Sequence, residues 1–339
     1  MAIAASVGAL PCIPVIDLRY EKLESFLTQE VKRLEQIYSV AQNHYGMGTL
    51  KIGDFLSRRW LKRNNNSYLD EIDLVHIIAP HEGAYMLNLS YEWSCTTCTD
   101  ADPNGAGNRM LRTLDWPLDG LGRNLIVLRR KTPAGDYWDV TWPGFVGIVT
   151  AMAPGRFSAA INQPPMRLWT SSYWSDWIIN RSKVWLQRAL PPSHLLRKTF
   201  DNCRNYSEAK QMLTETPLAI PAFFSLSGIE SDESCLIERT EKNAIVHKGP
   251  TTCANHWQNP ANRSWARGHE SNERLNAMNK TRNCPGLDFS WLKSPILNET
   301  TRVSVTANAA TDVLLVQGWE FDGAATRPLV LVESSSSFF

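Results

Sequence analysis

The residues best suited to chemistry lie in one short segment of the sequence. Ser94-Cys95-Thr96-Thr97-Cys98 is followed by Asp102-Pro103-Asn104-Gly105 and then by Arg112-Thr113-Leu114-Asp115. A strand, a turn and a returning strand predict a hairpin, which would bring Arg112 and Asp115 back beside Cys95. If the backbone is cut before Cys95, the new α-amine has a pKa of about 8 and can act as the base for the thiol of the same residue.

The other side chains of the hairpin have matching chemistry. Asp115 would hold and orient the ammonium form of the amine, and Arg112 would favour the thiolate and bind developing negative charge. The spacing alone also fits an ordinary hairpin with a buried cysteine. Cys98 is a competing nucleophile, because Cys98-Thr99 also reads Cys-Thr, but in a regular strand it faces away from Cys95. Spacing alone leaves these alternatives open.

The spacing of apolar residues predicts the elements around this hairpin. Helical periodicity covers 20–38, 52–61 and 69–78, so the first 90 residues are mainly helical. Short β-type runs fill 85–161, and helices return over 176–214, where Ile178, Val184, Trp185 and Leu186 are expected to be buried. Strands follow at 223–226, 235–237, 244–246, 302–306 and 313–317. Helices and strands in separate blocks favour an α+β fold with layers of antiparallel sheet covered by helices.

Composition excludes several classes of protein. The chain has 339 residues, is 43% hydrophobic, and carries 35 Lys and Arg against 34 Asp and Glu. This balance is typical of a folded globular protein, and the net charge of +1 disfavours nucleic acid as a partner. We find no phosphate-binding loop or metal-ligand cluster, and so expect no cofactor and no metal. No apolar run is long enough for a transmembrane segment. Without a recognisable signal peptide we expect a cytoplasmic protein, with secretion or a lysosome-like lumen as the alternative.

Several motifs resemble the acid ceramidase and N-acylethanolamine acid amidase family of N-terminal-nucleophile (Ntn) cysteine hydrolases, within the choloylglycine hydrolase-like superfamily. Cys95-Thr96-Thr97 and the returning Arg112-Thr113-Leu114-Asp115 resemble the start of the family's β-subunit. It is this resemblance that implies Cys95 as the nucleophile and a cut between Ser94 and Cys95. The resemblance continues through 88–92, 142–147, 194–237 and 292–298. In this sequence Leu111 replaces the family's glycine before the arginine, and the hairpin is about one residue longer.

The resemblance implies a fold, a division of the chain and an activity. The fold would be a four-layer αββα sandwich, with residues 1–94 as a helical α-subunit and 95–339 as the catalytic β-subunit. The activity would be hydrolysis of a linear N-acyl amide (ceramide-like, N-acylethanolamine-like or an N-acyl amino acid) through a thioester, after autocatalytic cleavage of the zymogen. The alternatives are a penicillin V or bile-salt type acylase, an acyltransferase, and a non-catalytic lipid-binding homologue.

The resemblance also assigns roles to residues outside the hairpin. Asn255, in Thr251-Thr252-Cys253-Ala254-Asn255-His256-Trp257, would donate its amide to the oxyanion, and Arg274 would brace the site. Asn162 and Trp142 would bind substrate. The family's acidic residue of the catalytic pocket has no clear match, Asp176 being the nearest candidate.

Partners and cysteine pairing follow from the same resemblance. The two fragments would remain together as an α/β heterodimer that binds an N-acyl amide or lipid substrate, with peripheral contact to membrane lipid. Seven cysteines leave at least one thiol outside any internal bridge. A bridge between Cys12 and Cys284 would fit secreted relatives, and a fully reduced chain is the alternative.

Overall fold

Two β-sheets lie face to face at the centre of the computed structural model, which describes residues 10–259, 263–286 and 288–332. The eight-stranded sheet has the order β1-β4-β5-β6-β7-β8-β9-β10. Its strands are β1 Val15–Asp17, β4 Ile126–Thr132, β5 Gly135–Thr141, β6 Thr150–Ala153, β7 Phe157–Asn162, β8 Ala222–Gly228, β9 Ser234–Arg239 and β10 Ala244–Lys248. Its neighbouring strands are antiparallel except β1 and β4, which run parallel.

The seven-stranded sheet carries the predicted hairpin at its centre. Its order is β11-β2-β3-β12-β13-β14, and β15 also pairs with β13. Its strands are β2 Ser94–Ala101, β3 Asn108–Asp115, β11 Thr251–Cys253, β12 Thr301–Asn308, β13 Val313–Glu320, β14 Gly323–Ala324 and β15 Leu329–Val332. β2 and β3 pack against β7 and β8 of the other sheet, so β2 is covered on both faces and its side chains alternate between two buried layers.

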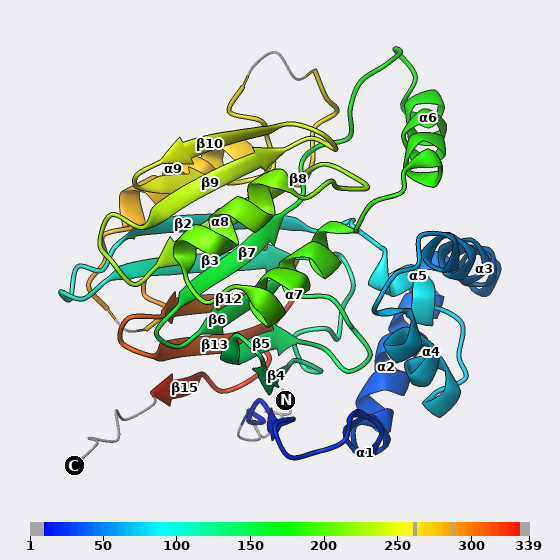
Figure 1. Ribbon diagram of the computed structural model, residues 1–339, viewed down its shortest axis with the longest axis horizontal. Coiled ribbons are helices and arrows are strands. Elements are labelled where there is room, and N and C mark those ends of the chain that lie inside the picture. Colours follow the sequence, from blue (N-terminus) through cyan, green and yellow to red (C-terminus); the bar gives the residue numbers. More distant parts are fainter. Residues whose placement is uncertain (1–9, 260–262, 287, 333–339) are drawn as a thin grey trace, which may run out of the picture.

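Helices cover the outer faces of both sheets. α7 (Pro192–Asn202) and α8 (Tyr206–Glu215) pack on β7 and β8, and α9 (Ser271–Thr281) packs on β2 and β11 (Figure 1). The arrangement is the expected αββα sandwich. Local sequence explains the start of α8, because Asn205 Oδ1 accepts from Glu208 N at 2.9 Å while Glu208 Oε2 accepts from Arg204 N at 2.7 Å. The first bond satisfies a backbone donor of the first helical turn, and the second satisfies that of the residue before the N-cap.

Five helices of the first 90 residues gather beside one end of the sandwich (Figure 1). They are α1 Leu23–Gln29, α2 Val31–Tyr45, α3 Met47–Arg63, α4 Leu69–Ile78 and α5 Ala84–Asn88. The helix expected over 20–38 is divided between α1 and α2, because the backbone leaves helical geometry at Glu30. Buried Asp54 accepts bonds from the backbone N–H groups of Gly83, Tyr85 and Met86 at 2.7–3.0 Å. That carboxylate satisfies the free donors at the start of α5.

Two elements differ from the sequence prediction. α6 (Tyr173–Leu186) stands apart from the sandwich, and the burial expected for Ile178 and Leu186 is wrong, since they are 59% and 75% exposed. α9 forms in a mostly polar stretch of the sequence. Apolar periodicity does not reveal this helix, because its buried residues are only Arg274 and Met278. The predicted β-runs at 223–226, 235–237, 244–246, 302–306 and 313–317 are confirmed as parts of β8, β9, β10, β12 and β13. No helix in the described ranges is long and apolar enough to cross a membrane.

Candidate active site

The register of the β2–β3 hairpin decides which side chains meet. Ser94 lies opposite Asp115, Cys95 opposite Leu114, and Thr97 opposite Arg112. Because alternate residues of a strand share a face, Cys95 and Thr97 point between the two sheets. This pairing brings Arg112 back to Cys95, as the sequence predicts.

Cys95 is fully buried between the sheets. Arg112 Nη2 donates to Cys95 Sγ at 3.3 Å, and the thiol in turn faces the carbonyl oxygen of Ile161 on β7 at 3.6 Å. Burial raises the pKa of the Cys95 thiol to about 11, although the Arg112 charge acts in the opposite direction. In the continuous chain the thiol is therefore neutral at pH 7, with a cation already placed to stabilise its anion.

Cys98 occupies the opposite face of β2. It packs with Leu111, Met278 and Trp291 beneath α9, and burial raises its pKa to about 12. In this apolar layer a thiol behaves as a small hydrophobic side chain.

A polar network across the two sheets holds Arg112. Its Nη1 donates to Asn162 Oδ1 at 2.9 Å and to Thr97 Oγ1 at 3.3 Å. Asn162 Nδ2 donates in turn to the carbonyl oxygens of Cys253 and Ala254 at 3.1 and 3.2 Å. Asn162 is fully buried and its amide is occupied by these protein groups. The structure therefore places it as a support of Arg112, and not as the substrate-facing residue expected from the sequence.

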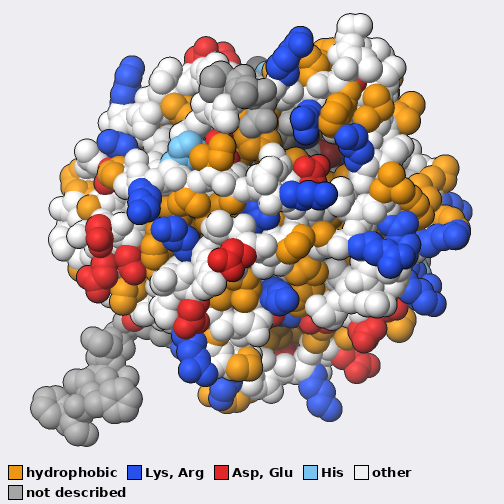
Figure 2. Space-filling view, turned by 45° about the horizontal axis from the view of Figure 1, so that its top comes forward, with side chains coloured by type: hydrophobic (Ala, Val, Ile, Leu, Met, Phe, Trp, Pro, Cys, Tyr) orange, Lys and Arg blue, Asp and Glu red, His pale blue; other side chains and the backbone are white. Residues whose placement is uncertain are grey.

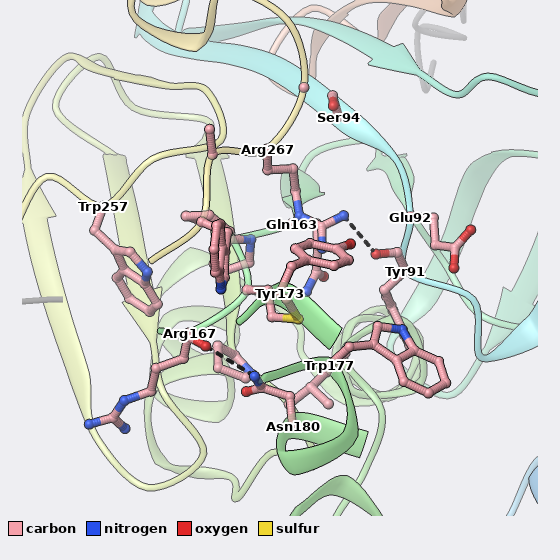
Figure 3. Close-up of a pocket in the computed structure, with 18 of the residues that line it drawn as sticks. Tyr91, Glu92, Ser94, Gln163, Arg167, Tyr173, Trp177, Asn180, Trp257 and Arg267 are labelled. Atoms are coloured by element: carbon pink, nitrogen blue, oxygen red, sulfur yellow. Dashed lines mark hydrogen bonds between the residues drawn. The ribbon is translucent and has the colours of Figure 1, made fainter. Parts of the chain in front are cut away.

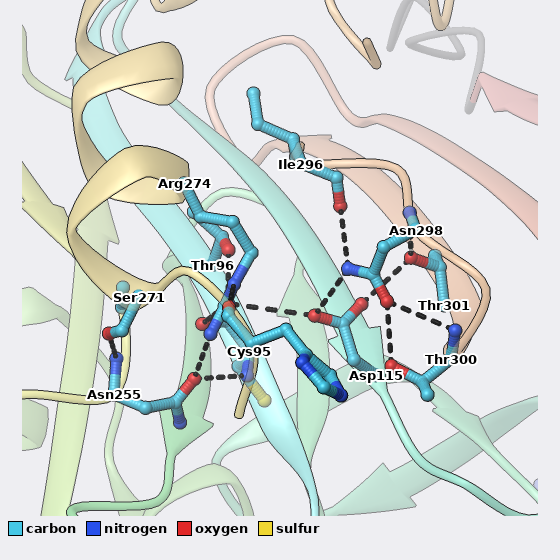
Figure 4. A network of polar contacts seen from close by, with 12 residues as sticks. Cys95, Thr96, Asp115, Asn255, Ser271, Arg274, Ile296, Asn298, Thr300 and Thr301 are labelled. Atoms are coloured by element: carbon cyan, nitrogen blue, oxygen red, sulfur yellow. Dashed lines mark hydrogen bonds and ion pairs between the residues drawn. The ribbon is translucent and has the colours of Figure 1, made fainter. Parts of the chain in front are cut away.

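Arg274 reaches from α9 to the backbone of the nucleophile (Figure 4). Its Nη1 donates to Cys95 O and to Thr96 Oγ1, both at 2.7 Å, and its Nη2 donates to Asn255 Oδ1 at 2.9 Å. The same guanidinium lies 3.5 Å from Asp115 Oδ2. All of these groups are buried, so Arg274 joins the start of β2 to the end of β3 in a setting of low dielectric, where charged hydrogen bonds are strong.

Asn255 contacts the amide of the predicted cut. Its Oδ1 accepts from Cys95 N at 2.8 Å, and its Nδ2 donates to Gln163 O at 2.8 Å. The sequence predicts that this amide donates to an oxyanion, whereas in the continuous chain that donor is bound to Gln163. The side chain is oriented by two donors at Oδ1, the backbone of Cys95 and the guanidinium of Arg274.

Asp115 is fully buried beside the predicted cleavage site. It accepts from Thr301 Oγ1 at 2.9 Å and from Asn298 Nδ2 at 3.2 Å, in addition to its ion pair with Arg274 (Figure 4). Burial raises the pKa of Asp115, and Arg274 with these hydrogen bonds offsets part of that effect. Asn298 and Thr301 come from the loop before β12 and from its first residue, which sequence spacing did not connect with the hairpin.

A cavity of about 540 Å³ opens beside Ser94 and Asp115 (Figure 3). It is bordered by 91–94, the 163–167 loop, α6 and the 263–269 loop. Gln163 lines it, and its buried Oε1 has no hydrogen-bond partner in the structure. Residue type and spacing alone do not predict a role for Gln163. Its place directly after Asn162 at the end of a buried strand is the signal that points to it.

Trp142 lies away from this cavity. Its Nε1 donates to Leu121 O at 2.7 Å, and its ring packs on Trp116 and Phe145 in the core. Because the residue is buried in this aromatic cluster, the structure does not place it as the substrate-binding residue expected from the sequence.

Asp176, the nearest acidic candidate for the pocket, holds the start of α6. Its carboxylate accepts from the backbone of Trp169 and Thr170 and from Trp265 Nε1.

In the described ranges the cysteines form no disulfide bridge, and no cluster of cysteine, histidine and acidic side chains forms a metal site. All seven cysteines, including Cys12 and Cys284, are free thiols in the structure. Residues 10–259, 263–286 and 288–332 contain no group of three or more His, Cys, Asp and Glu side chains that could hold a metal ion.

Part of this sequence is similar to that of known acid ceramidases. The chain matches no model of a protein family. It is 32% identical to the acid ceramidase of Homo sapiens over 109 residues and 30% identical to that of Bos taurus over 106 residues. Each match covers 31% of this chain and 25% of the relative, so the chain spans about a quarter of the length of the curated relatives it matches.

The fold is similar to that of a Caenorhabditis elegans N-acylethanolamine-hydrolyzing acid amidase ortholog. That match has a TM-score of 0.50 and 16% sequence identity, and covers 69% of this chain and 99% of the other. The chain is therefore similar in sequence to the acid ceramidases over about a third of its length, and its layered fold is similar to that of the amidase ortholog.

Proposed function

We propose that the chain is an autoprocessing N-terminal-cysteine amidase that hydrolyses a linear N-acyl amide to a fatty acid and an amine. One observation carries the proposal. The hairpin brings the guanidinium of Arg112 to 3.3 Å from Cys95 Sγ, while Asn255 and Arg274 hold the backbone N–H and carbonyl of the same residue. These contacts suit a residue that serves both as nucleophile and as a new N-terminus.

In the first stage the chain cuts itself. Cys95 Sγ attacks the carbonyl carbon of Ser94, the carbon–nitrogen bond to Cys95 breaks, and the thiol proton passes to the departing nitrogen. Water then hydrolyses the thioester, which releases the Ser94 carboxylate and leaves Cys95 with a free thiol and a free α-amine. Arg112 stabilises the sulfur anion, and Asn255 with Arg274 holds the backbone of Cys95 still.

After the cut the two fragments stay together as a heterodimer. Arg197 forms two hydrogen bonds of 2.7 Å with Glu71, Asn88 Oδ1 accepts from Val146 N at 2.7 Å, and β1 pairs with β4. The first 94 residues also contribute many side chains to the largest hydrophobic core cluster. Burial of this extent holds a separated segment in place.

In the second stage the processed Cys95 attacks the substrate. The α-amine, with a pKa of about 8 in an unperturbed chain, takes the thiol proton, and the thiolate adds to the amide carbonyl. The amine product leaves with a proton, and water hydrolyses the thioester with the α-amine again as base. Asn255 and a backbone N–H stabilise the oxyanion once the amide of Asn255 is released from Gln163.

The substrate is an N-acyl amide with a hydrocarbon acyl chain. The cavity beside Ser94 includes Tyr173, Trp177 and Trp265, side chains that bind hydrocarbon. Hydrophobic side chains also stay exposed on α6, which borders the cavity, and on α3. Trp174 and Ile178 on α6 and Ile52 and Phe55 on α3 are each 59–72% exposed.

The exposed residues of α3 and α6 form a surface suited to peripheral contact with lipid. α3 and α6 are joined by the bond from Trp60 Nε1 to Val184 O at 3.0 Å. On the side of the molecule where these helices lie, Figure 2 shows hydrophobic side chains among lysine and arginine side chains. Such a mixture favours the interface of an anionic bilayer. Vesicle flotation of Trp174→Ser and Phe55→Ser against the parent protein tests this contact.

The decisive experiment compares two buried cysteines of β2. Cys95→Ala should remain one chain on a denaturing gel and show no amidase activity, whereas Cys98→Ala should process and hydrolyse like the parent. Intact mass measures the cut between Ser94 and Cys95. A Cys95→Ala protein that is split at this bond would exclude the proposal, as would a parent protein that never processes.

A further inference from the structure

The cavity beside Ser94 is more cationic than the chain as a whole. The whole sequence is nearly balanced, with 35 basic and 34 acidic residues. The charged side chains that line the cavity are Arg167, Arg181, Lys183, Arg263 and Arg267 against Glu92, Asp115 and Glu241. Glu92 lies 3.8 Å from Arg181, and Asp115 lies 3.5 Å from Arg274. When these two paired carboxylates and Arg181 are set aside, the charged residues that still line the cavity are one carboxylate, Glu241, and four cations, Arg167, Lys183, Arg263 and Arg267.

Arg267 is the best placed of these cations. Its Nη1 donates to Tyr91 O at 3.1 Å, its Nε is buried without a hydrogen-bond partner, and no carboxylate of the described chain lies within ion-pair distance. In Figure 3 its guanidinium lies in the cavity between Tyr91, Gln163 and Tyr173. A half-buried guanidinium held in this way, with unused donors, is expected to bind a planar anion.

The loop of Arg267 lies directly against the bond that is cut. A Cβ atom at Gly268, the next residue, would overlap Ser94 Oγ. An anion bound by Arg267 would therefore lie close to the reacting amide. The first atoms of a hydrocarbon acyl chain carry no charge, so a charge this close belongs to the amine part of the substrate.

We propose that this cavity selects an N-acyl amide whose amine part carries a carboxylate, as in an N-acyl amino acid, with Arg267 as its principal ligand. The inference rests on the amidase function proposed above and narrows it. The other cations of the cavity add a positive field that favours entry of an anion. A neutral alcohol in the same place would offer the guanidinium only a neutral hydrogen-bond acceptor, which binds more weakly than a carboxylate.

The test uses two substrates that differ in one group. N-octanoylglycine and N-octanoylethanolamine share the acyl chain and the amide, and a carboxylate in one replaces a hydroxymethyl group in the other. Both are used as monomers without vesicles and compete in one reaction with processed enzyme. The ratio of their kcat/KM values is then independent of the amount of active enzyme. We expect the parent protein to favour the glycine amide by about tenfold or more, the scale of one charge-assisted contact.

Arg267→Gln should bring this ratio close to one, and Arg204→Gln, an exposed arginine outside the cavity, should leave it unchanged. Arg267 also donates to the backbone of Tyr91, which lies before the proposed cut. If the Arg267→Gln protein does not process, Arg263→Gln takes its place, and we expect a smaller fall in the ratio for that variant. Raising the ionic strength from about 0.05 to about 0.5 M should lower the ratio of the parent protein.

The outcomes separate the two proposals. If neither amide is hydrolysed by processed protein, the amidase function is wrong. If both are hydrolysed with equal kcat/KM, or the ethanolamide is preferred, the amidase function stands and selection by charge is wrong. A preference for the glycine amide that appears only when anionic vesicles are added would assign the cations to lipid binding and would also overturn the inference.

Discussion

The side-chain oxygen of Asn255 accepts a hydrogen bond of 2.8 Å from the backbone N–H of Cys95. In the proposed mechanism this nitrogen becomes the α-amine, so one side chain holds the same atom as an amide before the cut and as an amine after it. Arg274 fixes the orientation by donating to the same oxygen at 2.9 Å. The active site is therefore largely assembled before any bond is broken.

Removing the Asn255 amide should slow both stages of the reaction. Asn255→Ala loses the acceptor for Cys95 N and the donor intended for the oxyanion, and we expect a loss of about 10²- to 10³-fold in hydrolysis, as for other oxyanion donors. Single-turnover kinetics of processed protein and gel analysis of the cut measure the two stages. Asn202→Ala, an exposed helical position, is the control. An Asn255→Ala protein with full rates would remove this residue from the mechanism.

Arg274 should matter more to stability than Asp115. Arg274→Met leaves the Asp115 carboxylate buried without its cation, and we expect the free energy of unfolding to fall by about 3–5 kcal/mol. Arg274→Met/Asp115→Asn should recover part of that loss, because a neutral amide replaces the buried charge. Urea denaturation at pH 7 measures all three variants, with Asp115→Asn alone as the reference for the double change.

The same variant predicts a dependence on pH. Burial already raises the pKa of Asp115, and loss of Arg274 should raise it further. A raised carboxyl pKa means that the folded state prefers the protonated form. The stability that the protonated Asp115 carboxyl group contributes is complete at low pH, and it is lost as the pH rises through the pKa of this group in the folded state. The deficit of Arg274→Met relative to the parent should therefore be smaller at pH 5 than at pH 8, and an equal deficit at both would contradict this assignment.

Cys95 should become reactive only after processing. Its pKa of about 11 in the continuous chain leaves roughly one thiol in ten thousand ionised at pH 7. Iodoacetamide should therefore label Cys95 slowly in unprocessed chains and rapidly in the mature fragment, where an α-amine lies beside the thiol. Peptide mass spectrometry of the two populations measures the difference. Cys98, buried under α9, should stay unlabelled in both, and equal labelling of Cys95 in both forms would contradict the prediction.

Trp142 should contribute to stability and not to substrate binding. Trp142→Phe removes the hydrogen bond to Leu121 O and keeps an aromatic ring in the cluster. We expect a loss of about 1 kcal/mol in the free energy of unfolding with unchanged KM. Urea denaturation and steady-state kinetics give the two readouts. A raised KM with unchanged stability would return Trp142 to the substrate site.

The sequence by itself determined the local features of this protein. Turn residues between two β-type runs define the hairpin, and the strand period of two separates the face of Cys95 from that of Cys98. Apolar periodicity predicts α4 with the bounds that the structure shows, and α7 and α8 within the block expected to be helical. These features depend on neighbours close in the chain, so their signals survive in a single sequence.

Tertiary structure alone decided the contacts between distant segments. Asn298 and Thr301 reach Asp115 across more than 180 residues, and β1 joins a sheet whose next strand begins at Ile126. Tertiary structure also decided the different positions of Asn162 and Gln163. The side-chain amide of Asn162 bonds to Arg112 and to two backbone carbonyl groups, whereas Gln163 lines the cavity. Residue types and spacing cannot distinguish such neighbours, because their roles depend on which buried donors and acceptors the packing of two sheets brings within hydrogen-bond distance.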